Sequence, residues 1–113
     1  MTFRELLDEL VNAWAKADAQ RAAMFFCADG VYHEAGHAPI AGRAAIASHF
    51  AKFFRDGPAW RLEVDDVVVE GERAAVSYRF FIGGDARGWR ERAGCAMVRR
   101  RDGAIALWRE YHG

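Results

Sequence analysis

The sequence predicts an α+β fold, with helices packed on one face of a curved antiparallel sheet. Two observations predict it. Up to Pro58 the apolar residues recur at helical spacing, and after Pro58 four strand-length segments follow one another, separated by short turn sequences. A chain of 113 residues is long enough for one hydrophobic core, so we expect residues 1–113 to form a single domain.

Two helices are expected at the start of the chain. Thr2-Phe3-Arg4-Glu5 matches a capping box, and apolar residues spaced three and four apart extend the first helix over residues 3–17. A second, shorter helix is expected over residues 18–26, capped by Asp18 and ended by the turn-like Ala28-Asp29-Gly30. The two helices should form a hairpin.

A short strand and a third helix complete the N-terminal half. Val31–Glu34 is typical of a strand, and residues 35–41 contain the glycine and proline typical of a loop. The apolar residues of 42–55 again have helical spacing. Pro58 ends this third helix, because proline cannot continue the helical hydrogen bonds.

The C-terminal half is expected to be an antiparallel meander, because short turns join antiparallel neighbours. The expected strands are Trp60–Glu70, Arg73–Ile82, Arg87–Arg100 and Ala104–His112. The expected turns are Gly71-Glu72, Gly83-Gly84-Asp85 and Arg101-Asp102-Gly103.

Both faces of the expected strand Arg73–Ile82 carry apolar residues. A small antiparallel sheet normally leaves one face in water, so this pattern predicts that helices cover one face and a second subunit covers the other. We therefore expect a homodimer through the sheet, with Tyr78, Phe80, Cys95 and Met97 on the face away from the helices.

Charge and cysteine content disfavour several classes of partner. Sixteen Lys and Arg residues balance sixteen Asp and Glu residues, so no basic field is available for nucleic acid or an anionic membrane. No apolar run approaches the ~18 residues of a membrane span, and charged residues interrupt the first apolar stretch, unlike a secretory signal. Cys27 and Cys95 are isolated, which is typical of reduced thiols, so we expect a cytoplasmic protein.

No metal and no cofactor are expected. The four histidines lack the spacing of a metal-binding motif. Neither a phosphate-binding loop nor a dinucleotide fingerprint is present in the sequence.

The last expected strand places Glu110 between Trp108 and His112 on one face. If that face looks into the interior, the carboxylate needs a partner, because an unpaired buried charge is costly. Arg79 is the leading candidate, since it is the only charged residue in its strand between Arg73 and Asp85. A structural ion pair and a substrate-binding pair both remain open.

A second acidic position lies on the early strand, where Tyr32 and Glu34 share a face. One interpretation is a strand-end carboxylate in water. The other is that Tyr32, Glu34, Arg79 and Glu110 converge as catalytic residues in one cavity with an aromatic wall. The residues expected to contact a ligand there are Trp14, Phe50, Phe54, Phe81, Trp108 and His112.

Three motifs in this order resemble the SnoaL-like branch of the nuclear transport factor 2-like superfamily. They are Ala28-Asp29-Gly30-Val31-Tyr32-His33, Pro39-Ile40-Ala41-Gly42-Arg43-Ala44-Ala45-Ile46 and the terminal Asp102-Gly103-Ala104-Ile105-Ala106-Leu107-Trp108-Arg109-Glu110-Tyr111. The resemblance covers nearly the whole chain. It implies a cone-like, cystatin-like fold, in which a bent sheet wraps three helices around a deep pocket, and frequent dimers through the sheet.

Within that superfamily the terminal Trp-Arg-Glu-Tyr resembles the limonene epoxide hydrolase group. That group's pocket holds a Tyr, an Asn, an Arg and two carboxylates, which Tyr32, Glu34, Arg79 and Glu110 would match in part. Phe81 stands at the position of the second acid, so the proton-donating half of an epoxide-opening pair is absent. Glu34, in place of the Asn, could supply a replacement acid in a new geometry. The related steroid isomerases and polyketide cyclases use a carboxylate as a base on carbon, for which Glu110 or Glu34 would suffice.

The sequence therefore supports two alternative functions. The first is binding of a small, mostly apolar molecule in a deep pocket, with cofactor-independent isomerase, cyclase or hydrolase chemistry by a carboxylate base. The alternative is a ligand-binding or protein-assembly scaffold without catalysis, because one fold can serve many functions.

Overall fold

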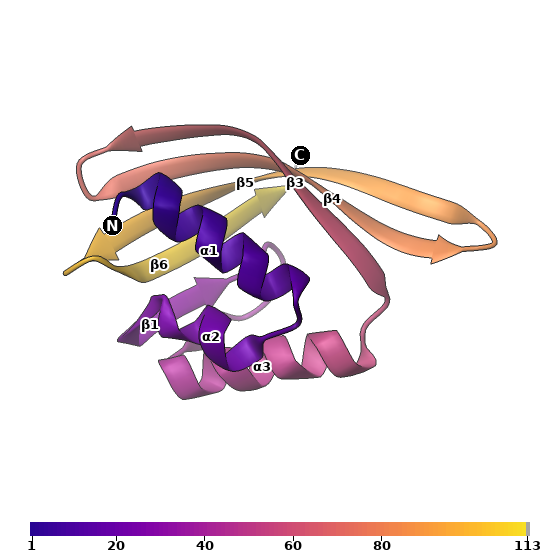
Figure 1. The fold of residues 1–113 in the computed structure, drawn as a ribbon, viewed down its shortest axis with the longest axis horizontal. Coiled ribbons are helices and arrows are strands. Elements are labelled where there is room, and N and C mark those ends of the chain that lie inside the picture. The colour runs from indigo at the N-terminus through magenta and orange to yellow at the C-terminus, as the bar shows by residue number, and fades with distance from the viewer. Residues whose placement is uncertain (113) are drawn as a thin grey trace.

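A computed structural model describes residues 1–112 and, of Asp85, the backbone alone. Three helices cover one face of a curved, open sheet, which confirms the predicted fold class (Figure 1). In chain order the elements are α1 (Phe3–Ala15), α2 (Ala19–Met24), β1 (Phe26–His33), β2 (Ile40–Ala41), α3 (Arg43–Asp56), β3 (Ala59–Glu70), β4 (Arg73–Asp85), β5 (Gly88–Arg101) and β6 (Ala104–His112).

The sheet is mixed, whereas the sequence predicts an antiparallel one. Its strand order is β2-β1-β6-β5-β4-β3, and β3 to β6 form the expected antiparallel meander. Strand β1 runs parallel to β6, with Tyr32 opposite Trp108. The prediction was wrong here because turn sequences report only on chain neighbours. Along the chain, β1 and β6 are separated by β2, α3 and the strands β3 to β5, so no short turn reports on their pairing.

The boundary between α2 and β1 also differs from the prediction. The expected helix continues to Phe26, but α2 ends at Met24 and Phe26 begins the strand. Phe26 is completely buried, and its ring lies 6.1 Å from that of Phe50, so tertiary packing overrides local helix propensity. The Ala28-Asp29-Gly30 sequence is a bulge within β1. A Cβ on its glycine would lie 2.9 Å from the Ile105 carbonyl oxygen.

The β4–β5 hairpin is longer than predicted and extends beyond the rest of the sheet (Figure 1). Gly83 and Gly84 do not reverse the chain but lie within β4, where the register shifts between Ile82 and Asp85. A Cβ on Gly83, whose φ is 129°, would lie 2.5 Å from the Gly88 carbonyl oxygen, so a side chain cannot be accommodated there.

Cross-strand pairing decides which residues of the meander face the helices. Gly94 of β5 lies opposite both Tyr78 of β4 and His112 of β6. Tyr78 is buried, and Phe80 packs against the core, so both point inward, contrary to the prediction that they face a second subunit. Cys95 and Met97 lie on the outer face, as predicted.

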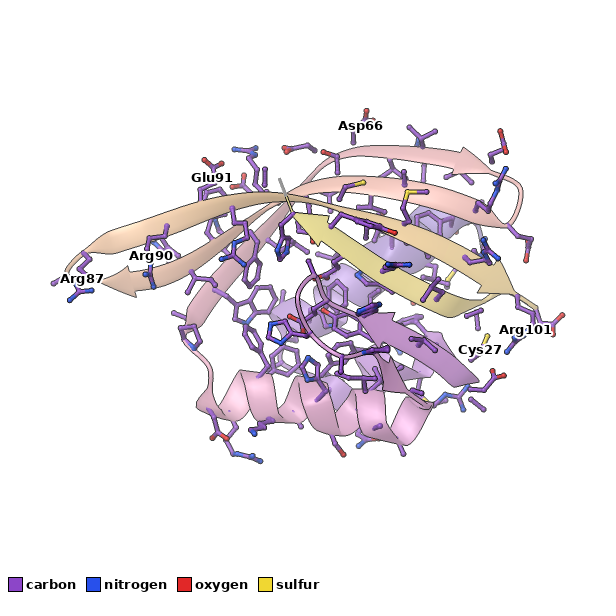
Figure 2. The ribbon with its side chains drawn as sticks, turned by 180° about the vertical axis from the view of Figure 1, so that it is seen from behind. Cys27, Asp66, Arg87, Arg90, Glu91 and Arg101 are labelled. Carbon is purple, nitrogen blue, oxygen red and sulfur yellow. The ribbon has the colours of Figure 1, made fainter. Side chains whose placement is uncertain are left out.

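The outer face of the sheet points away from all three helices. Figure 2 shows the labelled Asp66 and Glu91 on this side. Cys95 is a free, half-buried thiol here, whereas the free thiol of Cys27 is buried in strand β1. Among residues 1–112 no helix is both long and apolar enough to cross a membrane.

Candidate functional site

A cavity of about 200 Å³ lies between the helices and the inner face of the sheet. Its wall is mostly aromatic and aliphatic, and four of its aromatic residues form a continuous cluster in which neighbouring ring centroids lie 6.0–6.4 Å apart. These four are Phe53, Phe54, Trp60 and Phe80. Trp14 and Trp108 also line the cavity and pack edge to face, with ring centroids 5.4 Å apart.

Glu110 forms the polar end of this cavity. Its Oε2 accepts hydrogen bonds from the Tyr32 hydroxyl at 3.2 Å and from Trp108 Nε1 at 3.0 Å. The sheet produces this arrangement, because Tyr32 and Trp108 are cross-strand partners and Glu110 follows Trp108 by two residues on the same face. Oε1 accepts no hydrogen bond from any described residue, so one carboxylate oxygen keeps its hydrogen-bonding capacity.

The environment makes Glu110 a stronger base than an ordinary glutamate. Loss of hydration raises the pKa of this half-buried carboxyl, and the negative charge of Glu34 raises the pKa further. The hydrogen bonds from Trp108 and Tyr32 lower the pKa, but they are neutral donors and do not outweigh the loss of hydration. The bonds orient the carboxylate without the cation that would lower its basicity.

Glu34 also lines the cavity, and its Oε1 lies 2.6 Å from His49 Nε2. Both side chains are about one-third exposed. The His49 ring packs beside that of Tyr32, with centroids 5.6 Å apart. This pairing supplies a second group that could take or give a proton at the same end of the cavity.

Tyr78 lines the site although the sequence does not predict it there, because the apolar pattern of its strand predicts a subunit interface at this residue. Its side chain is 5% exposed and lines the cavity, and its hydroxyl is fully buried with no hydrogen-bond partner among the described residues. Burial raises the pKa of the Tyr78 phenol, and the charge of Glu110 raises it further, so the hydroxyl keeps its proton. Tyr78 therefore presents an unused donor.

Two basic side chains, Arg92 and His112, stand at the exposed rim of the cavity. Burial lowers the pKa of His112, and the neighbouring positive charge of Arg92 lowers it further. Only His112 was predicted from the sequence. The described residues contain no group of three or more His, Cys, Asp or Glu that could hold a metal ion.

Arg79 does not pair with Glu110, so the predicted ion pair is wrong. Arg79 lies on the outer face, where its Nε and Nη2 each lie 3.0 Å from Asp65, with Glu63 and Glu91 also within 4 Å. Alternation along β4 explains this placement, since Tyr78 faces inward and its neighbour must face outward.

Of the remaining residues predicted for the site, one lies outside the cavity and the others line it. Phe81 also lies on the outer face, beneath the Arg61 guanidinium, which is 4.3 Å from its ring centroid. The predicted residues that do line the cavity are Trp14, Tyr32, Glu34, Phe50, Phe54, Trp108, Glu110 and His112.

Residues 7–108 match the family described as the SnoaL-like domain, which covers most of the chain. The chain belongs to the SnoaL-like domain family. No curated protein matches it. The family membership confirms the resemblance stated from the sequence motifs.

Solved structures similar to this SnoaL-like domain share its fold at low sequence identity. A hypothetical protein with a ketosteroid isomerase-like fold from Catenulispora acidiphila, in complex with trimethylamine, is 19% identical over 95% of this chain and 84% of its own, with a TM-score of 0.82. An LEH-like epoxide hydrolase from M. tuberculosis is 20% identical over 96% and 80%, with a TM-score of 0.79. A putative SnoaL-like polyketide cyclase from Jannaschia sp. is 12% identical over 96% and 85%, with a TM-score of 0.74.

The raised pKa of Glu110 predicts a pH-dependent stability for this SnoaL-like domain. The folded protein holds the Glu110 proton more tightly than the unfolded chain, so ionised Glu110 costs stability at neutral pH. That cost disappears as the pH falls through the folded-state pKa. We expect Glu110→Gln to be the more stable protein at neutral pH and its advantage to shrink with acidification, measured as thermal midpoints. An advantage that grew in acid would contradict the raised pKa.

Proposed function

We propose that this SnoaL-like domain binds a small, mostly apolar molecule in the cavity and acts on it without a cofactor, with Glu110 as the base. One observation carries the proposal: at the polar end of an aromatic cavity, one oxygen of Glu110 is held by two neutral donors and the other has no hydrogen-bond partner among the described residues. Such a carboxylate is positioned, more basic than usual and accessible to a ligand, which general base catalysis requires.

The proposed reaction is removal of a proton from carbon, as in an isomerase or a cyclase, in preference to epoxide opening. Epoxide opening needs a second group to protonate the leaving oxygen. The positions expected to complete that machinery, Arg79 and Phe81, lie outside the cavity. Besides Glu110, the described hydrogen bonds orient two further proton-carrying groups at the cavity, the Tyr32 hydroxyl and the pair formed by Glu34 and His49.

The cavity volume limits the size of the proposed ligand. At about 200 Å³ it is smaller than the ~300–1,000 Å³ usual for sites that take drug-sized molecules. Similar structures described as an epoxide hydrolase and a putative polyketide cyclase support small-molecule chemistry on this fold. We therefore propose bicyclic or smaller substrates.

A thermal-shift screen with small ketones, lactones and epoxides tests the proposal. A ligand at about 100 times its dissociation constant should stabilise the folded protein by about 2.7 kcal/mol. Any compound that binds is then followed by NMR for chemical conversion, which separates an enzyme from a binding protein. A cavity that takes none of these compounds would contradict the proposal.

Exposed apolar residues on the outer face of the sheet favour a second function, the assembly of copies of this chain. Val68, Met97 and Tyr111 are 61%, 46% and 46% exposed there; Met97 and Tyr111 lie on the neighbouring strands β5 and β6, and Val68 lies on β3, which β4 separates from β5. We propose that a second copy of the chain covers this face, because large exposed apolar side chains on one face are typical of interfaces. Sedimentation should give a dimer at tens of micromolar, and Met97→Glu should give a monomer. A monomeric parent protein would contradict this interface.

A further inference from the structure

Arg92 of β5 places a positive charge at the rim of the cavity. It is the only lysine or arginine among the described residues that line the cavity. Cross-strand pairing puts Arg92 opposite Phe80, which points inward and belongs to the aromatic cluster of the wall. No hydrogen bond or ion pair joins the Arg92 guanidinium to another described residue. Its N–H donors are therefore left for water or a ligand.

His112 of β6 lies beside Arg92 on the inner face of the sheet. His112 is opposite Gly94, and Arg92 comes two residues before Gly94, so the two basic residues occupy diagonal positions on neighbouring strands. Diagonal neighbours are ~7–8 Å apart, which a long side chain can span. Gly94 places no side chain between them. Arg92 and His112 can therefore contact one group of a ligand together.

The charges around His112 show that the rim is positive. Burial lowers the pKa of His112 most, and the positive charge of Arg92 lowers it further. The nearby carboxylate of Glu34 raises this pKa, but by less than Arg92 lowers it, and His37 acts in the same direction as Arg92. Glu34 is also held by His49. The acidic residue at the rim therefore does not cancel the charge of Arg92.

These groups suit a carboxylate attached to an apolar body. A guanidinium binds a carboxylate through two parallel hydrogen bonds, and an imidazole N–H can donate a third. The carboxylates of Glu34 and Glu110 in the same cavity disfavour a doubly charged phosphate. We propose that Arg92 and His112 form a carboxylate subsite, so that the ligand is a small carboxylic acid whose apolar body packs against the cluster that contains Phe80.

This inference rests on the proposed function, because it assumes that the cavity takes a small molecule. It adds the chemical class of the ligand and its orientation. His112 follows Glu110 by two residues on the same face of β6. A carboxylate held at the rim would therefore leave the apolar body of the ligand extending inward, toward the base.

The test compares two compounds of one shape, 3-oxoindane-1-carboxylate and its carboxamide, which differ in charge. Both are 1-indanone with one added group. Dissociation constants are measured by NMR titration of the parent protein and of Arg92→Gln. We expect the parent protein to prefer the carboxylate. Arg92→Gln should weaken the carboxylate about fivefold, the loss of one exposed ion pair, and leave the carboxamide unchanged.

Arg90→Gln is the matched control. Arg90 is on the same face of β5, two residues farther along the hairpin, and does not line the cavity (Figure 2). The substitution removes the same charge from the same strand. It should change neither dissociation constant at physiological ionic strength, because salt screens exposed charges that do not touch the ligand.

The His112 signals in the proton NMR spectrum report where the ligand binds. Saturation with the carboxylate should raise the pKa of His112, because a negative charge then lies beside the ring, and the carboxamide should leave the pKa unchanged. In the free protein, Arg92→Gln should also raise the pKa of His112, because it removes the neighbouring positive charge.

The outcomes separate this inference from the proposed function. Equal affinity of the parent protein for both compounds, equal weakening of both by Arg92→Gln, or a His112 pKa that the bound carboxylate does not change would overturn the carboxylate subsite. Each of these results would leave an apolar binding cavity intact. If the parent protein bound neither compound and did not bind 1-indanone, the proposed function would lose its support and the subsite would fall with it.

Discussion

Glu110→Gln is expected to slow the exchange of the α-hydrogens of bound 1-indanone with deuterated water by about 10²–10⁴-fold. Glutamine keeps the shape of the side chain and can still accept from Tyr32 and Trp108, but it cannot take a proton. Binding should therefore survive while proton transfer is lost. The exchange is measured as the decay of the α-methylene signal in the proton NMR spectrum at saturating protein.

The pH dependence of this exchange has a defined direction. Because the pKa of Glu110 is raised above its ordinary value, the parent rate should rise with pH through that higher pKa and then level off. Glu34→Gln removes the other carboxylate of the cavity and keeps Glu110, so exchange should persist, with a pH profile shifted to lower pH because the Glu34 charge raises the pKa of Glu110. Exchange by the bound parent protein at the rate of buffer alone, or equal exchange by Glu110→Gln, would contradict a base at this position.

Trp108→Ala is expected to lower the free energy of unfolding by about 3–5 kcal/mol. Trp108 is 2% exposed and packs edge to face on Trp14, so its removal opens a large void in the core. It also removes one of the two donors to Glu110. Urea unfolding measures the change.

Trp89→Ala is the matched control for this substitution. Trp89 lies on the hairpin of β4 and β5 and is 45% exposed, so its removal should change the free energy of unfolding by no more than about 0.5 kcal/mol. Similar losses in the two variants would show that Trp108 does not anchor the core as described.

The fold was predictable from the sequence wherever the signal is local. The capping box at Thr2 forms as expected, and the last strand has the predicted bounds, Ala104–His112. The parallel pairing of β1 with β6 was not predictable, because it joins residues such as Tyr32 and Trp108 that are far apart in sequence. Helix α2 is short for the same reason, since the burial of Phe26 depends on distant neighbours.

The site was predictable where strand alternation was used. Glu110, Trp108 and His112 were placed together on that ground, and all three line the cavity. The prediction of Arg79 as the ion-pair partner of Glu110 rests on its opposite charge. Alternation alone would have assigned it correctly, since Tyr78 shares a wholly apolar face with Val76, Phe80 and Ile82, and that face is the one expected to be buried.

The two remaining polar features had no signal in the sequence. His49 and Glu34 come from a helix and from the residue after a strand, so no periodic pattern joins them. Tyr78 and Gly94 meet only through the register of β4 and β5. Both pairs depend on how the helices and strands pack against one another. Residue patterns along the sequence do not reveal this packing.

We propose that a small molecule binds at the Glu110 end of the cavity, and the indole groups of Trp108 and Trp89 provide a direct test of this claim. Trp108 Nε1 donates to Glu110, whereas Trp89 lies outside the cavity. A nitrogen–proton NMR spectrum recorded during titration with 1-indanone should show a saturating shift of the Trp108 indole signal and no shift for Trp89. A Trp108 signal that stays fixed while the ligand binds would contradict the claim.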